Sequence, residues 1–267
     1  MPALHEEGLQ LPSAISQAIP VQPLSHSQVG PASSSAHVPL KHGISLQVSG
    51  GAASTPASNT LDRSLEVAPS VLPGAVRALL ERNLELANAV IADDDEVDVY
   101  ERHIDQIGME ILVRFHPMAT DLRFVVSSMK ISMNLERISD HATSIAKRAK
   151  KMSASQELQD TTLIEPLYTL ADHLLRDAIS AYSDHDAALG ASLHLRDKEL
   201  DRMHKEATAT FGARIEQSNG RSQDYLHLIL VVRSLERVGD LAVNIGEDAV
   251  FLEAARDLRH ESNRELT

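Results

Sequence analysis

One stretch of the sequence occurs twice, and this repetition constrains the fold more than any other feature. Residues 135–146 read Leu-Glu-Arg-Ile-Ser-Asp-His-Ala-Thr-Ser-Ile-Ala, and residues 235–246 repeat the Leu, Glu, Arg, Asp, Ala and Ile at the same relative positions. A shorter acidic segment lies ahead of each copy, at 94–98 and at 197–201. Because both motifs recur in the same order and at nearly the same separation, the sequence predicts two copies of one structural unit.

Apolar residues three and four positions apart predict that each copy consists of helices. The predicted helices cover about 75–91, then from the three aspartates at 93–95 to His116, then about 118–152, 162–190, 192–217 and 222–256. Thr162 and Glu165 fit a capping box at the start of the fourth helix. The expected fold is therefore all-α, with two tandem three-helix bundles over residues 61–155 and 156–260.

The first sixty residues differ in composition from the rest of the chain. They contain seven of the eleven prolines, and their only charged side chains are Glu6, Glu7 and Lys41. Such a segment buries too little apolar surface to offset the entropy lost on ordering. We therefore expect a disordered tail over residues 1–60.

Composition excludes several classes of function. The formal charge of −13 opposes binding to the phosphate backbone of nucleic acids. The absence of cysteine excludes disulfides, thiolate nucleophiles and cysteine-ligated zinc. The sequence has no apolar run long enough for a membrane span and lacks the features of a signal peptide, so we expect a cytoplasmic protein.

The repeated motifs place acidic side chains in pairs. Residues four apart lie on the same face of a helix, about 40° from each other and beside the apolar stripe rather than within it. The four pairs are Asp94 with Asp98, Glu136 with Asp140, Asp197 with Asp201, and Glu236 with Asp240. Converging carboxylates repel one another, and a metal ion is the ordinary way to hold them together. Oxygen ligands favour Mg²⁺, Ca²⁺, Mn²⁺ or iron. The alternative is a solvated helix face on which Arg137 and Arg237 pair with the acids.

At these motifs the chain resembles the PhoU family, in which Glu-Arg-(Ile/Val)-x-Asp lies on the third helix of each three-helix repeat. The segment Pro117–Arg123 also resembles that family, and the similarity extends over about 61–256. The resemblance implies metal ions (Mg, Mn or Fe, including multinuclear iron clusters) at two sites. One site would use Asp94, Asp98, Glu136 and Asp140, and the other Asp197, Asp201, Glu236 and Asp240.

The resemblance also implies a role in phosphate homeostasis. PhoU-like proteins are cytoplasmic negative regulators of the phosphate-starvation response. They link a phosphate ABC transporter to a sensor histidine kinase, reach the inner membrane through these partners, and often form homodimers. The sequence itself shows no obvious phosphate pocket.

Other interpretations remain open. The motifs of nucleotide-binding enzymes, HExxH metalloproteases and GxSxG hydrolases are missing, so we expect no enzyme. A carboxylate-bridged metalloenzyme is the strongest enzymatic alternative, although no Glu-x-x-His occurs. The chain could also serve another phosphate transporter or act as a helical scaffold. The basic run Lys147–Lys151 suits a helix C-terminus or an acidic partner.

Overall fold

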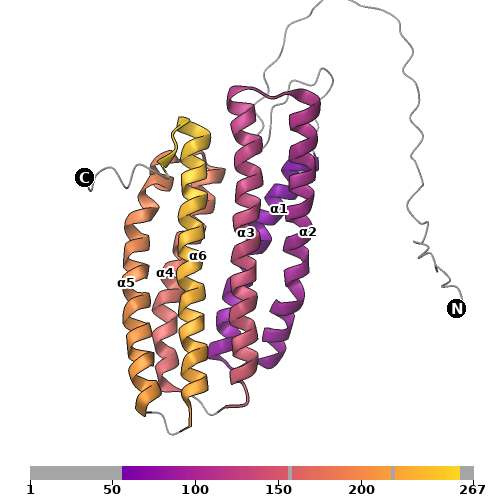
Figure 1. Cartoon of the computed structure of the whole chain (residues 1–267). Coiled ribbons are helices and arrows are strands. Elements are labelled where there is room, and N and C mark those ends of the chain that lie inside the picture. The colour runs from indigo at the N-terminus through magenta and orange to yellow at the C-terminus, as the bar shows by residue number, and fades with distance from the viewer. Residues whose placement is uncertain (1–55, 156–157, 218–219, 259–267) are drawn as a thin grey trace, which may run out of the picture. The chain divides into compact units, whose positions relative to one another are not determined.

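The computed structural model describes residues 56–155, 158–217 and 220–258, and these form helices joined by short turns (Figure 1). The helices are α1 (Pro56–Leu80), α2 (Leu84–Phe115), α3 (Ala119–Met152), the 3₁₀ helix η1 (Gln159–Leu163), α4 (Ile164–Ser183), α5 (Ala187–Gln217) and α6 (Ser222–Ala254). No strand occurs among the described residues. The predicted all-α fold of two three-helix bundles is confirmed. The predicted tail lies outside the described residues except at its end, where α1 already begins at Pro56.

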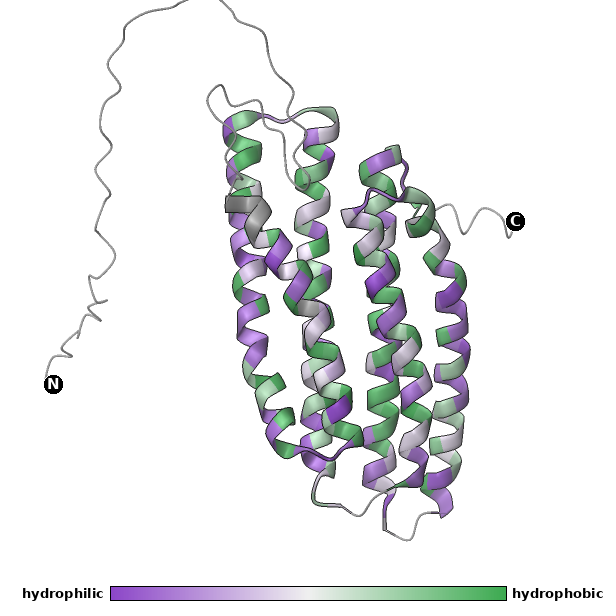
Figure 2. Ribbon diagram, turned by 180° about the vertical axis from the view of Figure 1, so that it is seen from behind, coloured by the Kyte–Doolittle hydropathy of each residue, from purple (hydrophilic) through white to green (hydrophobic). Residues whose placement is uncertain are grey.

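The third helix of each repeat is the central element of its bundle. Helix α3 packs against α1 and α2, α6 packs against α4 and α5, and the two bundles meet along α3 and α6 (Figure 1). The predicted apolar stripes are fully buried, with Leu135 and Ile138 on α3 and Leu235 and Val238 on α6 among them. Figure 2 shows hydrophobic and hydrophilic residues interspersed along every helix, as expected for helices with one buried face.

The predicted first helix over 75–91 is wrong, because this range contains the turn between α1 and α2. Arg82 in the turn has a φ of 55°, and the Leu86 amide donates a hydrogen bond to the Asn83 side chain (3.0 Å). Asn83 is therefore the N-cap of α2. The apolar periodicity continues across this turn and conceals it.

The predicted helix break at the three aspartates 93–95 is also wrong. These residues lie in the interior of α2, where Val90 and Val97 on either side are buried against the core. Their burial stabilises the helix through a segment of low intrinsic helix propensity.

The boundary between the fourth and fifth helices lies earlier than predicted. Helix α4 ends at Ser183 and α5 begins at Ala187, so Gly190 is in the first turns of α5 and does not end α4. The expected capping box is absent, because Thr162 lies in η1 and donates its hydroxyl to the Gln159 carbonyl (3.1 Å). None of the described helices is apolar over a length sufficient to cross a lipid bilayer.

Candidate metal centre

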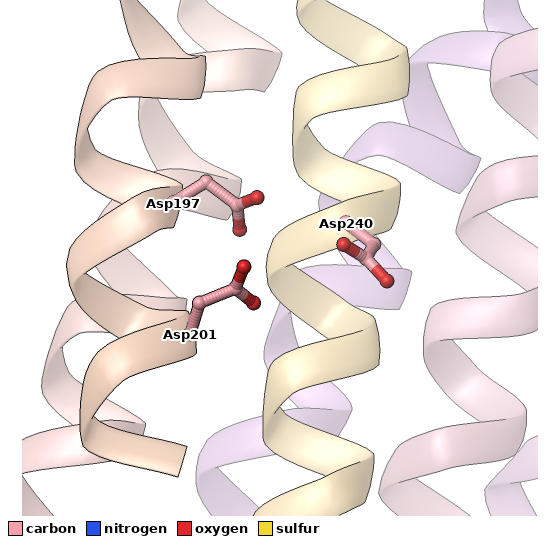
Figure 3. A group of neighbouring side chains, drawn as sticks. All are labelled: Asp197, Asp201 and Asp240. Carbon is pink, nitrogen blue, oxygen red and sulfur yellow. The ribbon is translucent and has the colours of Figure 1, made fainter. Parts of the chain in front are cut away.

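Three aspartates of the second repeat converge between α5 and α6. Asp197 and Asp201 extend from successive turns of α5 toward α6, which carries Asp240 (Figure 3). One oxygen from each of the three lies within 4.8 Å of the others, and all three residues are partly buried. Within the part of the chain that the structure describes, this is the one group of three potential ligands that meets this spacing.

The packing of α5 and α6 against the core fixes the positions of these three aspartates. On α5, Leu193 and Leu200 are fully buried, and on α6 Leu235 and Val238 are fully buried. Because the acidic residues sit beside these positions on the helical wheel, they lie at the edge of the contact between the helices and not within the core.

The Asp197 carboxyl is in the most unusual environment of the three. Burial, followed by the charges of Asp240, Asp201 and Glu236, raises its pKa to about 7. Its Oδ1 atom is buried and has no hydrogen-bond partner. A buried carboxylate oxygen without a partner is costly, and a cation between the acids would satisfy it.

Gly239 on α6 explains why Asp197 lies so close to the neighbouring helix. A Cβ atom at position 239 would lie 2.7 Å from Asp197 Oδ1 and 2.4 Å from Leu200 Cδ2. The carboxylate is therefore packed against bare backbone that offers it no side-chain donor. These observations fit a site for a hard cation with oxygen ligands.

The fourth predicted ligand of this repeat, Glu236, lies beside the group of three aspartates and outside it. Burial and the charge of Asp240 raise the pKa of Glu236, and its Oε2 is buried without a hydrogen bond. The Arg237 Nε lies 3.4 Å from that oxygen, within ion-pair distance but without hydrogen-bond geometry. Arg237 also donates to Asp240 Oδ2 (2.9 Å), so one guanidinium partly neutralises the cluster.

The four predicted ligands of the first repeat influence one another but converge less closely. Burial and then the charges of Asp140 and Asp98 raise the pKa of Glu136. Burial and then the charges of Asp94 and Asp98 raise the pKa of Asp140. No three of these acids meet the spacing found in the second repeat.

The difference between the repeats centres on one position. The Ser139 hydroxyl donates to Asp94 Oδ1 (3.0 Å), whereas Gly239 leaves the equivalent Asp197 Oδ1 without a partner. Sequence reasoning missed this contrast, although the mismatch of Ser139 and Gly239 inside otherwise matching motifs was visible. Glu101 is not one of the predicted ligands, but its charge contributes to the raised pKa of Glu136.

Comparison with known proteins identifies both repeats. A family model described as the PhoU domain matches residues 61–149 and again residues 164–249. The phosphate-specific transport system accessory protein PhoU homolog of Pseudomonas putida is 34% identical over 194 residues, which are 72% of this chain and 76% of that protein. The homolog of Caulobacter vibrioides is 32% identical over 185 residues, 68% of this chain and 79% of that protein.

Solved structures show the same fold. The crystal structure of PhoU from Pseudomonas aeruginosa superposes with a TM-score of 0.72 at 29% identity, covering 75% of this chain and 96% of that one. The phosphate transport system regulatory protein PhoU from Streptococcus pneumoniae shares the fold at 22% identity, with a TM-score of 0.69.

Proposed function

The chain belongs to the PhoU family, and from this premise we propose that it is a metal-binding accessory protein of a phosphate transport system. It acts in the cytoplasm as a homodimer and negatively regulates the phosphate-starvation response. It does so by linking a phosphate ABC transporter to a sensor histidine kinase. The names of the relatives support the transport role, since they are accessory proteins of phosphate-specific transport.

The observation that carries the metal-binding part of the proposal is the unpartnered Oδ1 of Asp197 within the three converging aspartates. Asp197, Asp201 and Asp240 hold the ion, and Glu236 lies close enough to add to the negative charge. When bound, an ion such as Mg²⁺, Mn²⁺ or iron supplies positive charge that neutralises the carboxylates and holds α5 to α6. We assign this ion a structural or sensory role and not a catalytic one.

The first repeat provides a second, weaker site in this proposal. Asp94, Asp98, Glu136 and Asp140 are its ligands. Asp94 already accepts the Ser139 hydroxyl, and Asp98 lies 3.8 Å from Arg102. A metal ion must compete with these interactions, which lowers its affinity for the first repeat.

Titration of chelator-treated protein with Mn²⁺, followed by calorimetry and elemental analysis, tests the assignment. The variant Asp197→Asn/Asp201→Asn/Asp240→Asn should lose the tighter binding phase, because neutral amides remove the charge that attracts the ion. The matched variant Asp94→Asn/Asp98→Asn/Asp140→Asn carries the same substitutions in the other repeat and should retain that phase. A tight phase that persists unchanged in the second-repeat variant would rule out this site.

The regulatory role requires a test in cells. Deleting the gene should derepress a phosphate-starvation reporter in phosphate-rich medium, and the wild-type gene should restore repression. Reporter expression that does not change on deletion would contradict negative regulation. Expressing the Asp197→Asn/Asp201→Asn/Asp240→Asn variant in the deletion strain then shows whether these three metal ligands are required for repression.

A further inference from the structure

A cavity between α3 and α6 collects basic side chains from both repeats. It has a volume of about 240 Å³, and its polar lining comes from His141, Ser144 and Arg148 of α3 and from Arg233, Ser234 and Arg237 of α6. No acidic residue is part of this lining. We call it the arginine cavity. It opens beside a larger cavity of about 440 Å³ that shares His141 and Arg237 and reaches Asp197 and Asp240.

Two arginines of the arginine cavity lack counter-ions. Among the described residues, neither Arg148 nor Arg233 has a carboxylate within ion-pair distance, whereas Arg237 is paired with Asp240. The Arg148 Nε atom is buried and has no hydrogen-bond partner. A buried N–H of a guanidinium without an acceptor is costly in free energy.

The composition of the chain makes this arrangement unusual. The protein has 38 acidic and 25 basic side chains, so carboxylates are abundant. Other exposed arginines form ion pairs with these carboxylates, for example Arg77 with Glu81 and Arg202 with Glu199. Arginines that face a cavity without such partners are placed to bind a ligand that brings its own negative charge.

We infer that the arginine cavity binds a phosphate oxyanion. Guanidinium groups from facing helices can each donate two parallel hydrogen bonds to a tetrahedral oxyanion, and Ser144 adds a hydroxyl. The volume far exceeds that of one water molecule, which occupies about 30 Å³ in the liquid. Because Arg148 comes from the first repeat and Arg233 from the second, the bound anion bridges the two bundles. This site goes beyond the proposed metal function, since its two unpaired arginines are not metal ligands.

Calorimetry with inorganic phosphate on chelator-treated full-length protein at low ionic strength tests the inference. The wild type should bind phosphate, and Arg148→Gln/Arg233→Gln should weaken binding at least about tenfold, which corresponds to about 1.4 kcal/mol. Arg202→Gln is the matched control, because it removes the same charge from an arginine paired with Glu199 and Glu206 and should leave the affinity unchanged. The single variant Arg233→Gln provides a second test, since this side chain is exposed and its loss does not disturb the core.

Adenosine monophosphate distinguishes the source of the phosphate group. Tighter binding of this phosphomonoester than of inorganic phosphate assigns the cavity to a phosphorylated metabolite, and the reverse order assigns it to free phosphate. Absence of binding for both ligands, or equal affinity in the wild type and the two arginine variants, would overturn the inference. Binding that disappears on chelation and returns with Mn²⁺ would also overturn it, because the metal centre would then hold the anion.

Discussion

Position 139 of the first repeat is serine and position 239 of the second is glycine, and this difference changes the state of a partly buried carboxylate. Ser139 donates a hydrogen bond to Asp94, while the equivalent Asp197 faces the backbone of Gly239 and keeps an oxygen without a partner. The two sites therefore have the same types of acidic residue, but only the second has a buried carboxylate oxygen that a cation would not have to take from a hydrogen bond. The difference lies in a neighbouring residue and not in the ligands themselves.

At the residue scale, the raised pKa of Asp197 predicts a pH-dependent cost in stability. The folded-state pKa of about 7 lies above the ordinary aspartate value of 3.8, so the folded protein binds the proton more tightly than the unfolded chain. The metal-free protein should therefore lose stability as pH rises from about 4 to about 7, with the full penalty present above that range. Asp197→Asn should stabilise it at about pH 8 by roughly 1–2 kcal/mol, less than the full shift implies because water screens the partly exposed group.

Urea denaturation of both proteins with a chelator present, at several pH values, measures this effect. The matched control is Asp94→Asn, which removes a carboxylate that already accepts the Ser139 hydroxyl. If Asp197→Asn changes stability equally at all pH values, or destabilises most at high pH, the environment assigned to Asp197 is incorrect.

Among the helices, the close contact between α5 and α6 depends on two further glycines besides Gly239. A Cβ atom at Gly190 would lie 2.6 Å from the Gly246 carbonyl oxygen, and one at Gly246 would lie 2.6 Å from Leu193 Cδ1. Helices α5 and α6 can approach this closely next to the metal ligands only because neither Gly190 nor Gly246 has a side chain. An alanine there would force the helices apart and would also disturb the spacing of Asp197 and Asp240.

Alanine substitutions at the two glycines of α5, Gly190 and Gly212, should consequently change the stability of the protein in opposite directions. Gly190→Ala should destabilise the protein by about 1–3 kcal/mol, since overpacking against backbone outweighs the gain in helix propensity. Gly212→Ala in the same helix meets nothing within 4 Å and should stabilise the protein by up to about 1 kcal/mol. Thermal and chemical denaturation of the two variants provides the comparison. Equal stabilisation by both would show that the helices do not approach as closely as described.

Helix existence was predictable from periodicity, but helix ends were less so. The extents of α3 and α6 agree with the predicted 118–152 and 222–256, because their apolar stripes are long and end at turn residues. The boundary between α1 and α2 was missed because apolar spacing continues through Arg82 and Asn83. Proline disfavours a helix interior, yet Pro69 and Pro73 both lie inside α1. Leu72 and Ala75 are fully buried, and their packing against the core offsets the free-energy cost of the two prolines.

In the molecule as a whole, the two repeats share one hydrophobic core along α3 and α6. Polar contacts reinforce this interface: Lys130 Nζ lies 3.0 Å from Asp248 Oδ1 and 5.2 Å from the ring centroid of Phe251. The Arg123 Nε also donates to the Leu252 carbonyl (3.0 Å). Neither repeat buries its third helix completely without the other, so we expect both to unfold in one transition.

The variant Lys130→Met tests whether the two repeats unfold together. Removing the lysine breaks its ion pair with the largely buried Asp248, and the protein should lose about 2–4 kcal/mol while still unfolding in a single step. Adding Asp248→Asn should recover part of the loss, because the carboxylate that lost its lysine is then replaced by a neutral amide. Far-UV circular dichroism and tyrosine fluorescence during urea denaturation should give coincident curves. Two separated transitions would show that the repeats are independent.

The sequence by itself determined the repeat, the all-α class, the buried stripes of the third helices and the pairing of acids along each helix. These features follow from local periodicity, since positions four apart share a face in any α-helix. The tertiary structure alone decided that Asp197, Asp201 and Asp240 converge while Glu236 lies beside them. It also brought Arg148 and Arg233 to one cavity. Distances between side chains on different helices depend on how closely the helices approach, and here glycines at 190, 239 and 246 set that approach.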